Sequence, residues 1–159
     1  MKKFTIYTDG SCLGNPGAGG WAAVIIDAEE NIKKICGGES QTTNNRMELT
    51  AAIEALKKIS SGDSAEIFTD SSYLKNAFTQ GWLRKWKVNG WKTANKKPVL
   101  NKDLWLELDR LISVRDIKFN WVKGHAGNKF NEICDSLARG EAEKNKGLEK
   151  NSRPLTLFD

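Results

Sequence analysis

The sequence predicts an α/β domain, a mixed β-sheet with helices packed on its faces. Three strand-like segments come first, and alternating helical and strand-like segments follow them. A run of strands that gives way to helices alternating with strands is typical of such layered sheets. At 159 residues the chain is long enough for one domain with a substantial hydrophobic core.

Hydrophobic periodicity predicts each element in turn. Apolar residues recur at helical spacing from Leu49 to Leu56, whereas residues 116–123 alternate like a strand. The expected strands are residues 4–9, 20–27, 32–39, 64–70 and 116–123. The expected helices are residues 45–59, two short helices within 72–88 separated near Gly81, 101–112 and 129–144. We expect the domain to span residues 1–145 and residues 146–159 to form a flexible polar tail.

Composition narrows the class of protein. No segment is apolar and long enough to span a bilayer, and the basic N-terminus is not followed by the apolar run of a signal peptide. The three cysteines, Cys12, Cys36 and Cys134, lack metal-ligand spacing and are expected to be reduced thiols. We therefore expect a cytoplasmic protein that does not bind membranes, and we expect a monomer.

Positive charge is concentrated in one segment. Between Ser71 and Lys102 there is no Asp or Glu but there are eight Lys or Arg residues, and three tryptophans are interleaved with them. Basic side chains neutralise phosphates and aromatic rings stack on bases, so the pattern is typical of a nucleic-acid contact. A solvated helix face with its tryptophans in the core would give the same pattern. The pattern alone leaves both interpretations open.

Two aspartates stand in matched contexts, Asp9 in IYTDGS and Asp70 in IFTDSS, each at the end of an apolar strand. Ligands gather beyond the strand ends of sheets covered by helices. Two carboxylates on neighbouring strand ends repel unless one is protonated or a cation lies between them. Taken singly, either residue would also fit a turn-capping aspartate. The glycine-rich loop after Asp9 leads into strand-like WAAVII, which argues against a dinucleotide-binding motif because that motif needs a helix there.

Three further polar residues are ambiguous from spacing alone. Glu48 follows Asn45 at the distance of a capping box, yet it also borders the apolar stripe of its helix. Asp135 lies on the apolar stripe of the last helix, and Arg139 four residues later would form an ordinary ion pair with it. His125, the only histidine, lies in a glycine-flanked loop, where it could exchange protons near neutral pH.

Five segments in sequence order resemble the successive motifs of bacterial type I ribonuclease H. They are YTDGSCLGNPGAGGWA, TTNNRMELTAAIEAL, IFTDSSYL, GWKTANKKPV with DLW, and WVKGHAGNKFNEICDSLA. The resemblance extends from Phe4 to Arg139. It implies the ribonuclease H-like fold, with a five-stranded mixed sheet flanked by helices. It also implies hydrolysis of the RNA strand of RNA–DNA hybrids, with 5′-phosphate and 3′-hydroxyl products.

Carried over by position, the family's acidic set falls on Asp9, Glu48, Asp70 and Asp135, and its mobile histidine falls on His125. The resemblance implies that the four carboxylates bind metal and that catalysis follows a two-metal-ion mechanism. Hard oxygen ligands suit Mg²⁺, with Mn²⁺ as an alternative. The histidine is implied as a proton shuttle or an aid to product release.

The resemblance also implies the substrate contacts. Asn15, Asn44 and Asn45 match positions that contact the hybrid, and short amides can both donate to and accept from a 2′-hydroxyl. Thr43 matches part of a pocket for a DNA-strand phosphate. Residues 82–98 match the family's basic protrusion. The substrate-binding residues expected in this protrusion are Trp82, Lys85, Trp86 and Lys87.

Three positions depart from the family pattern. Ser72 stands where many relatives have glutamine, Gly81 is an additional residue before the protrusion, and Val88 replaces a basic residue. None of them belongs to the acidic set. Two other functions are weighed: a hybrid-binding module without catalysis, which the intact acidic set disfavours, and a related nuclease acting on DNA or structured RNA, which the asparagines and the protrusion disfavour.

The end of the chain carries a separate feature. Leu155, Leu157 and Phe158 are apolar residues at the end of a polar stretch. The segment PLTLF resembles the short peptide with which bacterial replication proteins dock onto the sliding clamp, with Pro154 in place of its glutamine. A tethered docking peptide would raise the effective concentration of the enzyme at its partner. The alternative is a tail that folds back on the domain or stays loose.

Overall fold

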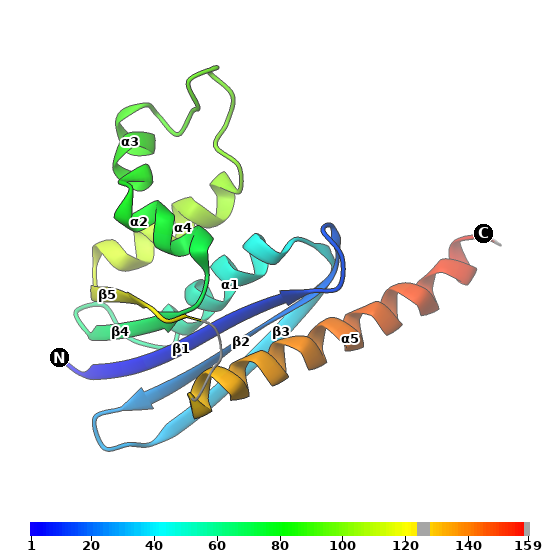
Figure 1. Cartoon of the computed structure of the whole chain (residues 1–159), viewed down its shortest axis with the longest axis horizontal. Coiled ribbons are helices and arrows are strands. Elements are labelled where there is room, and N and C mark those ends of the chain that lie inside the picture. The colour runs from blue at the N-terminus through cyan, green and yellow to red at the C-terminus, as the bar shows by residue number, and fades with distance from the viewer. Residues whose placement is uncertain (124–127, 158–159) are drawn as a thin grey trace.

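The computed structural model describes residues 1–123 and 128–157 (Figure 1). The strands are β1 (Lys3–Cys12), β2 (Gly17–Asp27), β3 (Ile32–Thr42), β4 (Ser64–Thr69) and β5 (Asp116–Trp121). The helices are α1 (Asn44–Leu56), α2 (Ser72–Thr79), α3 (Trp82–Val88), α4 (Lys102–Ser113) and α5 (Lys129–Leu157). None of the helices in these ranges is long and apolar enough to cross a membrane.

The five strands form one mixed sheet in the order β3-β2-β1-β4-β5. β1, β2 and β3 pair antiparallel, as two tight connections allow, whereas β4 and β5 run parallel to β1 after helical crossovers. The predicted five-stranded mixed sheet flanked by helices is therefore confirmed. All the strands and helices expected from periodicity are present.

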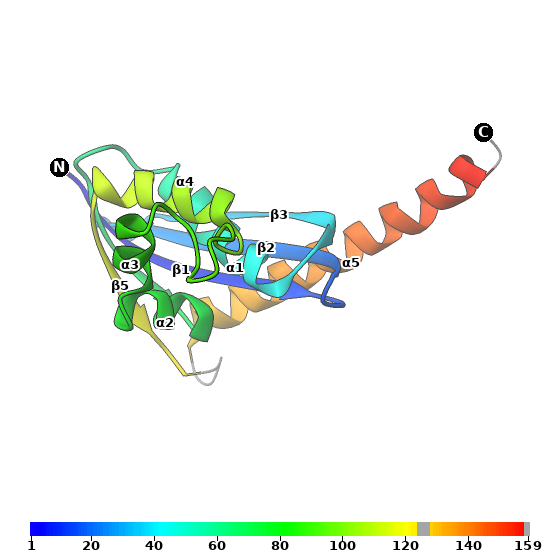
Figure 2. The same ribbon diagram turned by 90° about the horizontal axis from the view of Figure 1, so that it is seen from above.

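The sheet has a hydrophobic layer on each face, because successive side chains of a strand point to opposite sides. On one side Ala23 and Ile25 of β2 join the larger cluster, which holds α1 and α4 and extends to α2 and α3. On the other side Ala22 and Val24 pack against α5. Figures 1 and 2 show α5 running along its face of the sheet and extending beyond the sheet edge.

The approach of α5 to the sheet depends on Gly20 of β2. A Cβ built on Gly20 would lie 2.1 Å from the carbonyl oxygen of Ala138. Only glycine therefore allows the helix backbone to lie against this strand. The contact fixes the height of α5 over the sheet and thus the position of Asp135, one turn earlier.

The structure corrects three predicted boundaries. β1 continues to Cys12, so Asp9 lies inside the strand rather than at its end, because β2 extends alongside it to Gly17. The N-cap of α1 is Thr43, whose side chain accepts a hydrogen bond from Arg46 N at 3.3 Å, and the predicted Asn45 cap is wrong. α5 continues beyond residue 144 to Leu157. Good helix formers continue there after the apolar period is lost.

The cysteines are all free thiols, and they differ in exposure. Cys134 is fully buried, and its Sγ donates to the carbonyl oxygen of Tyr7 at 3.3 Å. Burial, with the nearby charge of Asp9, raises the pKa of the Cys134 thiol to about 12. This thiol is therefore unreactive at neutral pH.

Candidate active site

Strand register brings Asp9 and Asp70 together. β1 and β4 pair in parallel up to Tyr7 and Phe68, and two further residues along each strand direction lead to the two aspartates. β4 ends at Thr69, so Asp70 lies where the parallel part of the sheet ends beside β1. The two matched sequence contexts thus occupy the same level of neighbouring strands.

Glu48 completes the group from the first turns of α1. Its Oε1 accepts a hydrogen bond from the backbone N–H of Gly10, and its side chain is buried. A Cβ on Gly10 would lie 2.5 Å from the Glu48 backbone nitrogen, so α1 can approach the strand only over a glycine. Because Thr43 is the N-cap, Glu48 does not stand at capping-box spacing, and that alternative is excluded.

Oxygen atoms of Asp9, Glu48 and Asp70 lie within 4.8 Å of one another. Asp9 is 5 % exposed and Glu48 is 3 % exposed. Burial raises the pKa of Glu48 well above its ordinary value, and the charges of Asp9 and Asp70 raise it further. The arrangement concentrates negative charge, and this concentration disfavours ionisation of its most buried member.

Asp135 faces the same pocket from α5. The pocket has a volume of about 380 Å³, and its lining includes all four carboxylates. Asp135 also forms the expected ion pair with Arg139, at 2.8 Å. Asp135 pairs with Arg139 and also lines the pocket, so the ion pair expected from the sequence does not exclude a role in the site.

The residues fit a divalent cation. Among the described residues, the charged side chains that line the pocket are all carboxylates, and Arg139 pairs with Asp135 from outside this lining. Buried like charges are costly unless a proton or a cation balances them. The donors are all carboxylate oxygens, which are the ligands of hard divalent ions. Asp9, Glu48 and Asp70 would hold such an ion, with Asp135 at the pocket wall.

Four of the predicted substrate residues lie together around the start of α1. Asn44 and Asn45 line the carboxylate pocket. Asn15 Oδ1 accepts a hydrogen bond from Asn44 N at 2.9 Å, so the loop after β1 is attached to the helix N-terminus. Thr43, next to them, uses its hydroxyl to cap the helix. The structure thus brings polar groups of two distant segments to one side of the carboxylates.

The basic protrusion has half-buried tryptophans and exposed lysines. Trp82, Trp86 and Trp91 are half-buried against the larger hydrophobic cluster, with ring centroids about 6 Å apart in sequence order. Lys85 and Lys87 are exposed, and Lys87 forms an ion pair with Asp109 at 2.7 Å. The aromatic residues therefore build the protrusion, and its charge is carried by the lysines on its surface.

The predicted proton-transfer histidine and the predicted docking tail involve residues that the structure describes only in part or not at all. His125 lies outside the described residues. Leu155 and Leu157 fall within the last turns of α5, and Phe158 lies outside the described residues. Proton transfer by the histidine and docking of the tail to a sliding clamp therefore stay predictions.

Gly10 and Tyr73 belong to the site although the sequence interpretation did not select them. Gly10 admits Glu48, and its signal in the sequence is a glycine directly after the strand aspartate. Tyr73 lines the pocket, and its hydroxyl accepts hydrogen bonds from Asn101 Nδ2 at 3.1 Å and Trp105 Nε1 at 2.9 Å. Those partners are distant in sequence, so no local pattern indicated this role.

Comparison with known proteins identifies the family. The RNase H family profile matches residues 1–143. This chain belongs to the RNase H family. Ribonuclease H of Ehrlichia chaffeensis is 55 % identical over 141 residues, which are 89 % of this chain and 95 % of the relative. Ribonuclease H of Acetivibrio thermocellus is 52 % identical over 145 residues, which are 91 % and 98 % of the two chains.

Solved structures agree with this assignment. LC9-RNase H1, a type 1 RNase H with the type 2 active-site motif, is 30 % identical with a TM-score of 0.80, over 91 % of this chain and 74 % of that one. LC11-RNase H1, solved in complex with RNA/DNA hybrid, is 25 % identical with a TM-score of 0.65, over 89 % and 97 % of the two chains. The bacterial ribonuclease H resemblance is confirmed, and family membership makes the chain a hydrolase of the nuclease class.

Proposed function

We propose that this RNase H hydrolyses the RNA strand of RNA–DNA hybrids at the Asp9–Glu48–Asp70 cluster, giving 5′-phosphate and 3′-hydroxyl ends. The observation that carries the proposal is the cluster itself, three carboxylates within 4.8 Å beside Asn44 and Asn45 in one pocket. A relative of the same fold was solved in complex with RNA/DNA hybrid. Membership of the RNase H family supports the reaction class, and the carboxylates and asparagines of the pocket are residue types suited to that reaction.

The carboxylates would hold two Mg²⁺ ions, with Mn²⁺ as the alternative. When bound, such a pair supplies the positive charge that activates water and stabilises the leaving oxygen of an in-line displacement. Asp9 and Asp70 project from the sheet, which gives them rigid positions. The Gly10 N–H orients Glu48, and the Gly20 contact sets the height of Asp135. The protein would thus contribute carboxylates in fixed positions, against which the metal ions would align the scissile phosphate.

Asn15, Asn44 and Asn45 would select RNA by contact with 2′-hydroxyl groups. A hybrid presents those hydroxyls in a wide, shallow minor groove, which short amide side chains can reach. Asn15 and Asn44 are held together by their hydrogen bond, so the donors and acceptors are arranged before substrate arrives. Thr43 and the protrusion residues Trp82, Lys85, Trp86 and Lys87 would contact the DNA strand. His125 would carry a proton or assist product release.

Cleavage of matched substrates tests this function. The protein is incubated with labelled RNA–DNA hybrid, duplex DNA and duplex RNA of one sequence, with and without Mg²⁺. We expect cleavage of the RNA strand of the hybrid alone, only with Mg²⁺, and fragments with 3′-hydroxyl ends. Binding without cleavage would leave a hybrid-binding module, and equal cleavage of duplex DNA or duplex RNA would indicate a different nuclease.

A further inference from the structure

Trp121, at the end of β5, lies beside the carboxylate pocket without lining it. Trp121 ends β5 opposite Thr69, which ends β4. The Val122 N–H donates to the carbonyl oxygen of Thr69 at 2.8 Å, and the indole Nε1–H of Trp121 donates to that of Asp70 at 3.3 Å. These bonds hold Trp121 directly beside the main chain of one carboxylate residue.

Trp121 differs from the other tryptophans in its exposure. All six lie in the described part of the chain, and only Trp121 is exposed, with 42 % of its surface accessible. It belongs to neither hydrophobic cluster.

Lys75 lies over this ring. Its Nζ is 4.2 Å from the ring centroid, the arrangement of a cation–π contact, which holds a long flexible side chain in one place. Lys75 lies in the first turn of α2, where its N–H donates to the Ser71 carbonyl oxygen at 3.0 Å, and Ser71 lines the carboxylate pocket. The ammonium group lies over the ring whose indole N–H bonds to the main chain of Asp70, itself a residue of the pocket lining.

The charge of Lys75 is available for a ligand. Within residues 1–123 and 128–147, no carboxylate lies at ion-pair distance from Lys75. Lys87 in the protrusion is different, because Asp109 already pairs with it. An ammonium group held in place without an acidic partner is suited to a phosphate.

We propose that Lys75, held over Trp121, binds a backbone phosphate of the nucleic acid on the side of the site away from the protrusion. Figures 1 and 2 show α2 between α3 and the end of β5, so the protrusion and Trp121 lie on either side of it. A duplex whose scissile phosphate lies over Asp9 and Asp70 continues in both directions. The protrusion would bind the duplex on one side of the scissile phosphate, and Lys75 would bind a backbone phosphate on the other side. The inference rests on the proposed hybrid substrate.

Salt-dependent binding tests it. Anisotropy of a labelled RNA–DNA hybrid is measured in metal-free buffer from 50 to about 200 mM salt, the range in which phosphate contacts are resolved. Lys75→Ala should reduce the slope of log K against log salt by about 0.9, the value for one lost phosphate contact. Lys34→Ala is the matched control: it is exposed on β3, at the opposite edge of the sheet, and should leave the slope unchanged.

The role of the ring is tested by a double-mutant cycle. Trp121→Leu should reduce the slope as Lys75→Ala does, Trp121→Phe should retain most of it, and Lys75→Ala should add little in the Trp121→Leu background. In the cleavage assay Lys75→Ala should raise KM several-fold and preserve kcat. An unchanged slope in Lys75→Ala would overturn the proposal. So would additive losses, or a Trp121→Leu variant with lower kcat and an unchanged slope, because the ring would then act on Asp70 alone. Failure of the wild-type protein to cleave hybrid would instead contradict the proposed function.

Discussion

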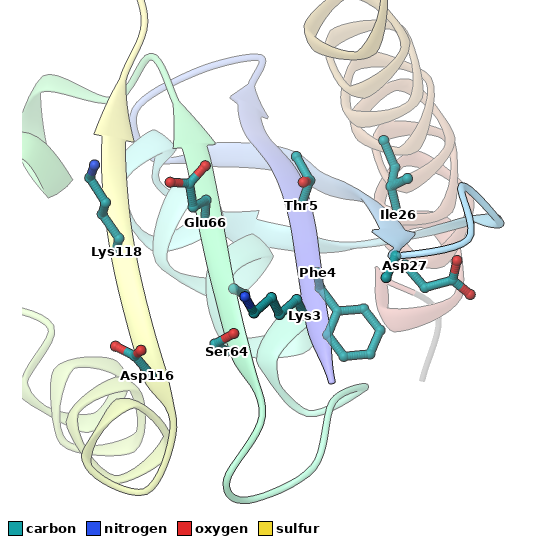
Figure 3. A pocket seen from close by; sticks show the side chains of 11 residues that line it. Lys3, Phe4, Thr5, Ile26, Asp27, Ser64, Glu66, Asp116 and Lys118 are labelled. Carbon is teal, nitrogen blue, oxygen red and sulfur yellow. The ribbon is translucent and has the colours of Figure 1, made fainter. Parts of the chain in front are cut away.

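The two ends of the sheet use aspartates in opposite ways. At the starts of β1, β4 and β5 a hollow of about 510 Å³ is lined by residues of both charges, including Lys3 and Lys118 with Glu66 and Asp116 (Figure 3). At the other end the pocket is smaller, about 380 Å³, and the charged residues in its described lining are all acidic. Charge imbalance, and not size, therefore distinguishes the candidate active site.

Individual aspartates show the same difference. Asp63 accepts hydrogen bonds from the backbone N–H groups of Lys2 and Ser60, at 2.9 and 2.8 Å, and these bonds lower its pKa. Asp27 closes the β2–β3 turn in the same manner, mainly with Asn31. Both are the turn-capping aspartates that Asp9 and Asp70 could have been from sequence. Asp27 and Asp63 each hold turn residues by hydrogen bonds, whereas Asp9, Glu48 and Asp70 place their carboxylate oxygens within 4.8 Å of one another.

The largest expected effect is on kcat, and it distinguishes aspartates of the candidate active site from Asp63 at the other end of the sheet. Asp9→Asn or Asp70→Asn should lower kcat about 10³-fold or more, because loss of a ligand charge removes several kcal/mol of transition-state stabilisation. Hybrid affinity should be nearly kept, since phosphate and sugar contacts supply it. Asp63→Asn, the same chemical change at the other end, should leave kcat unchanged. Single-turnover cleavage at moderate Mg²⁺ measures all three, and near-normal cleavage by Asp70→Asn would refute the site.

The second effect concerns His125, which lies in the sequence between β5 and α5. A general acid–base group contributes about 10²–10⁴-fold, so His125→Ala should slow turnover and leave measurable activity. The loss should be smaller at alkaline pH than at neutral pH if hydroxide or buffer replaces its proton transfer. Steady-state kinetics across pH measure this. A loss equal to that of Asp9→Asn would assign the histidine an essential role instead.

The third effect compares basic residues. Replacing Lys85, Lys96 and Lys97 with alanine should raise KM with kcat nearly kept, and each lost phosphate contact should reduce the salt slope of binding by about 0.9. Lys87→Ala should change the slope less, because Asp109 already pairs with Lys87. Lys118→Ala, in the hollow at the strand starts, should change nothing. An unchanged slope in the triple variant would show that the protrusion surface is merely solvated.

The smallest expected effect is on folding stability, which should depend on pH in opposite ways through Glu48 and through Asp63. Folding raises the pKa of Glu48 above 4.5, so its protonated form is favoured and metal-free stability falls as pH rises through the raised value. Folding lowers the pKa of Asp63 below 3.8, so its contribution is present at neutral pH and is lost as pH falls through the lowered value.

Melting curves with EDTA at several pH values test this pair. At pH 7 Glu48→Gln should melt about 2–4 °C above the wild type, the shift expected for about 1 kcal/mol in a chain of this size. Asp63→Asn should melt below the wild type. The Glu48→Gln difference should shrink toward pH 4, whereas the Asp63→Asn difference should persist at pH 4 and shrink only as the pH falls below 3.8. A Glu48→Gln variant that melts lower at pH 7 would mean that the ionised glutamate is stabilised in the metal-free fold.

The sequence by itself determined the layered fold, the order of its elements and the four acidic candidates. Periodicity and turn residues are local, and five motifs in order are specific enough to identify the family. It could not determine whether Glu48 capped a helix or faced Asp9, because the answer depends on where α1 begins and on the clearance above Gly10. Nor could local spacing show that Asp9 and Asp70 lie beside each other, whereas Asp27 and Asp63 accept hydrogen bonds from turn residues.

Tertiary structure decided these points because a charge is defined by its neighbours. Parallel pairing of β1 and β4 brings two carboxylates from positions 61 residues apart to one level, and α1 and α5 add two more. The same packing left the tryptophans of the protrusion half-buried and its lysines exposed, and it left Trp121 exposed beneath Lys75. Local patterns set which groups are available, whereas the distances between strands and helices set their pKa values, their partners and their chemistry.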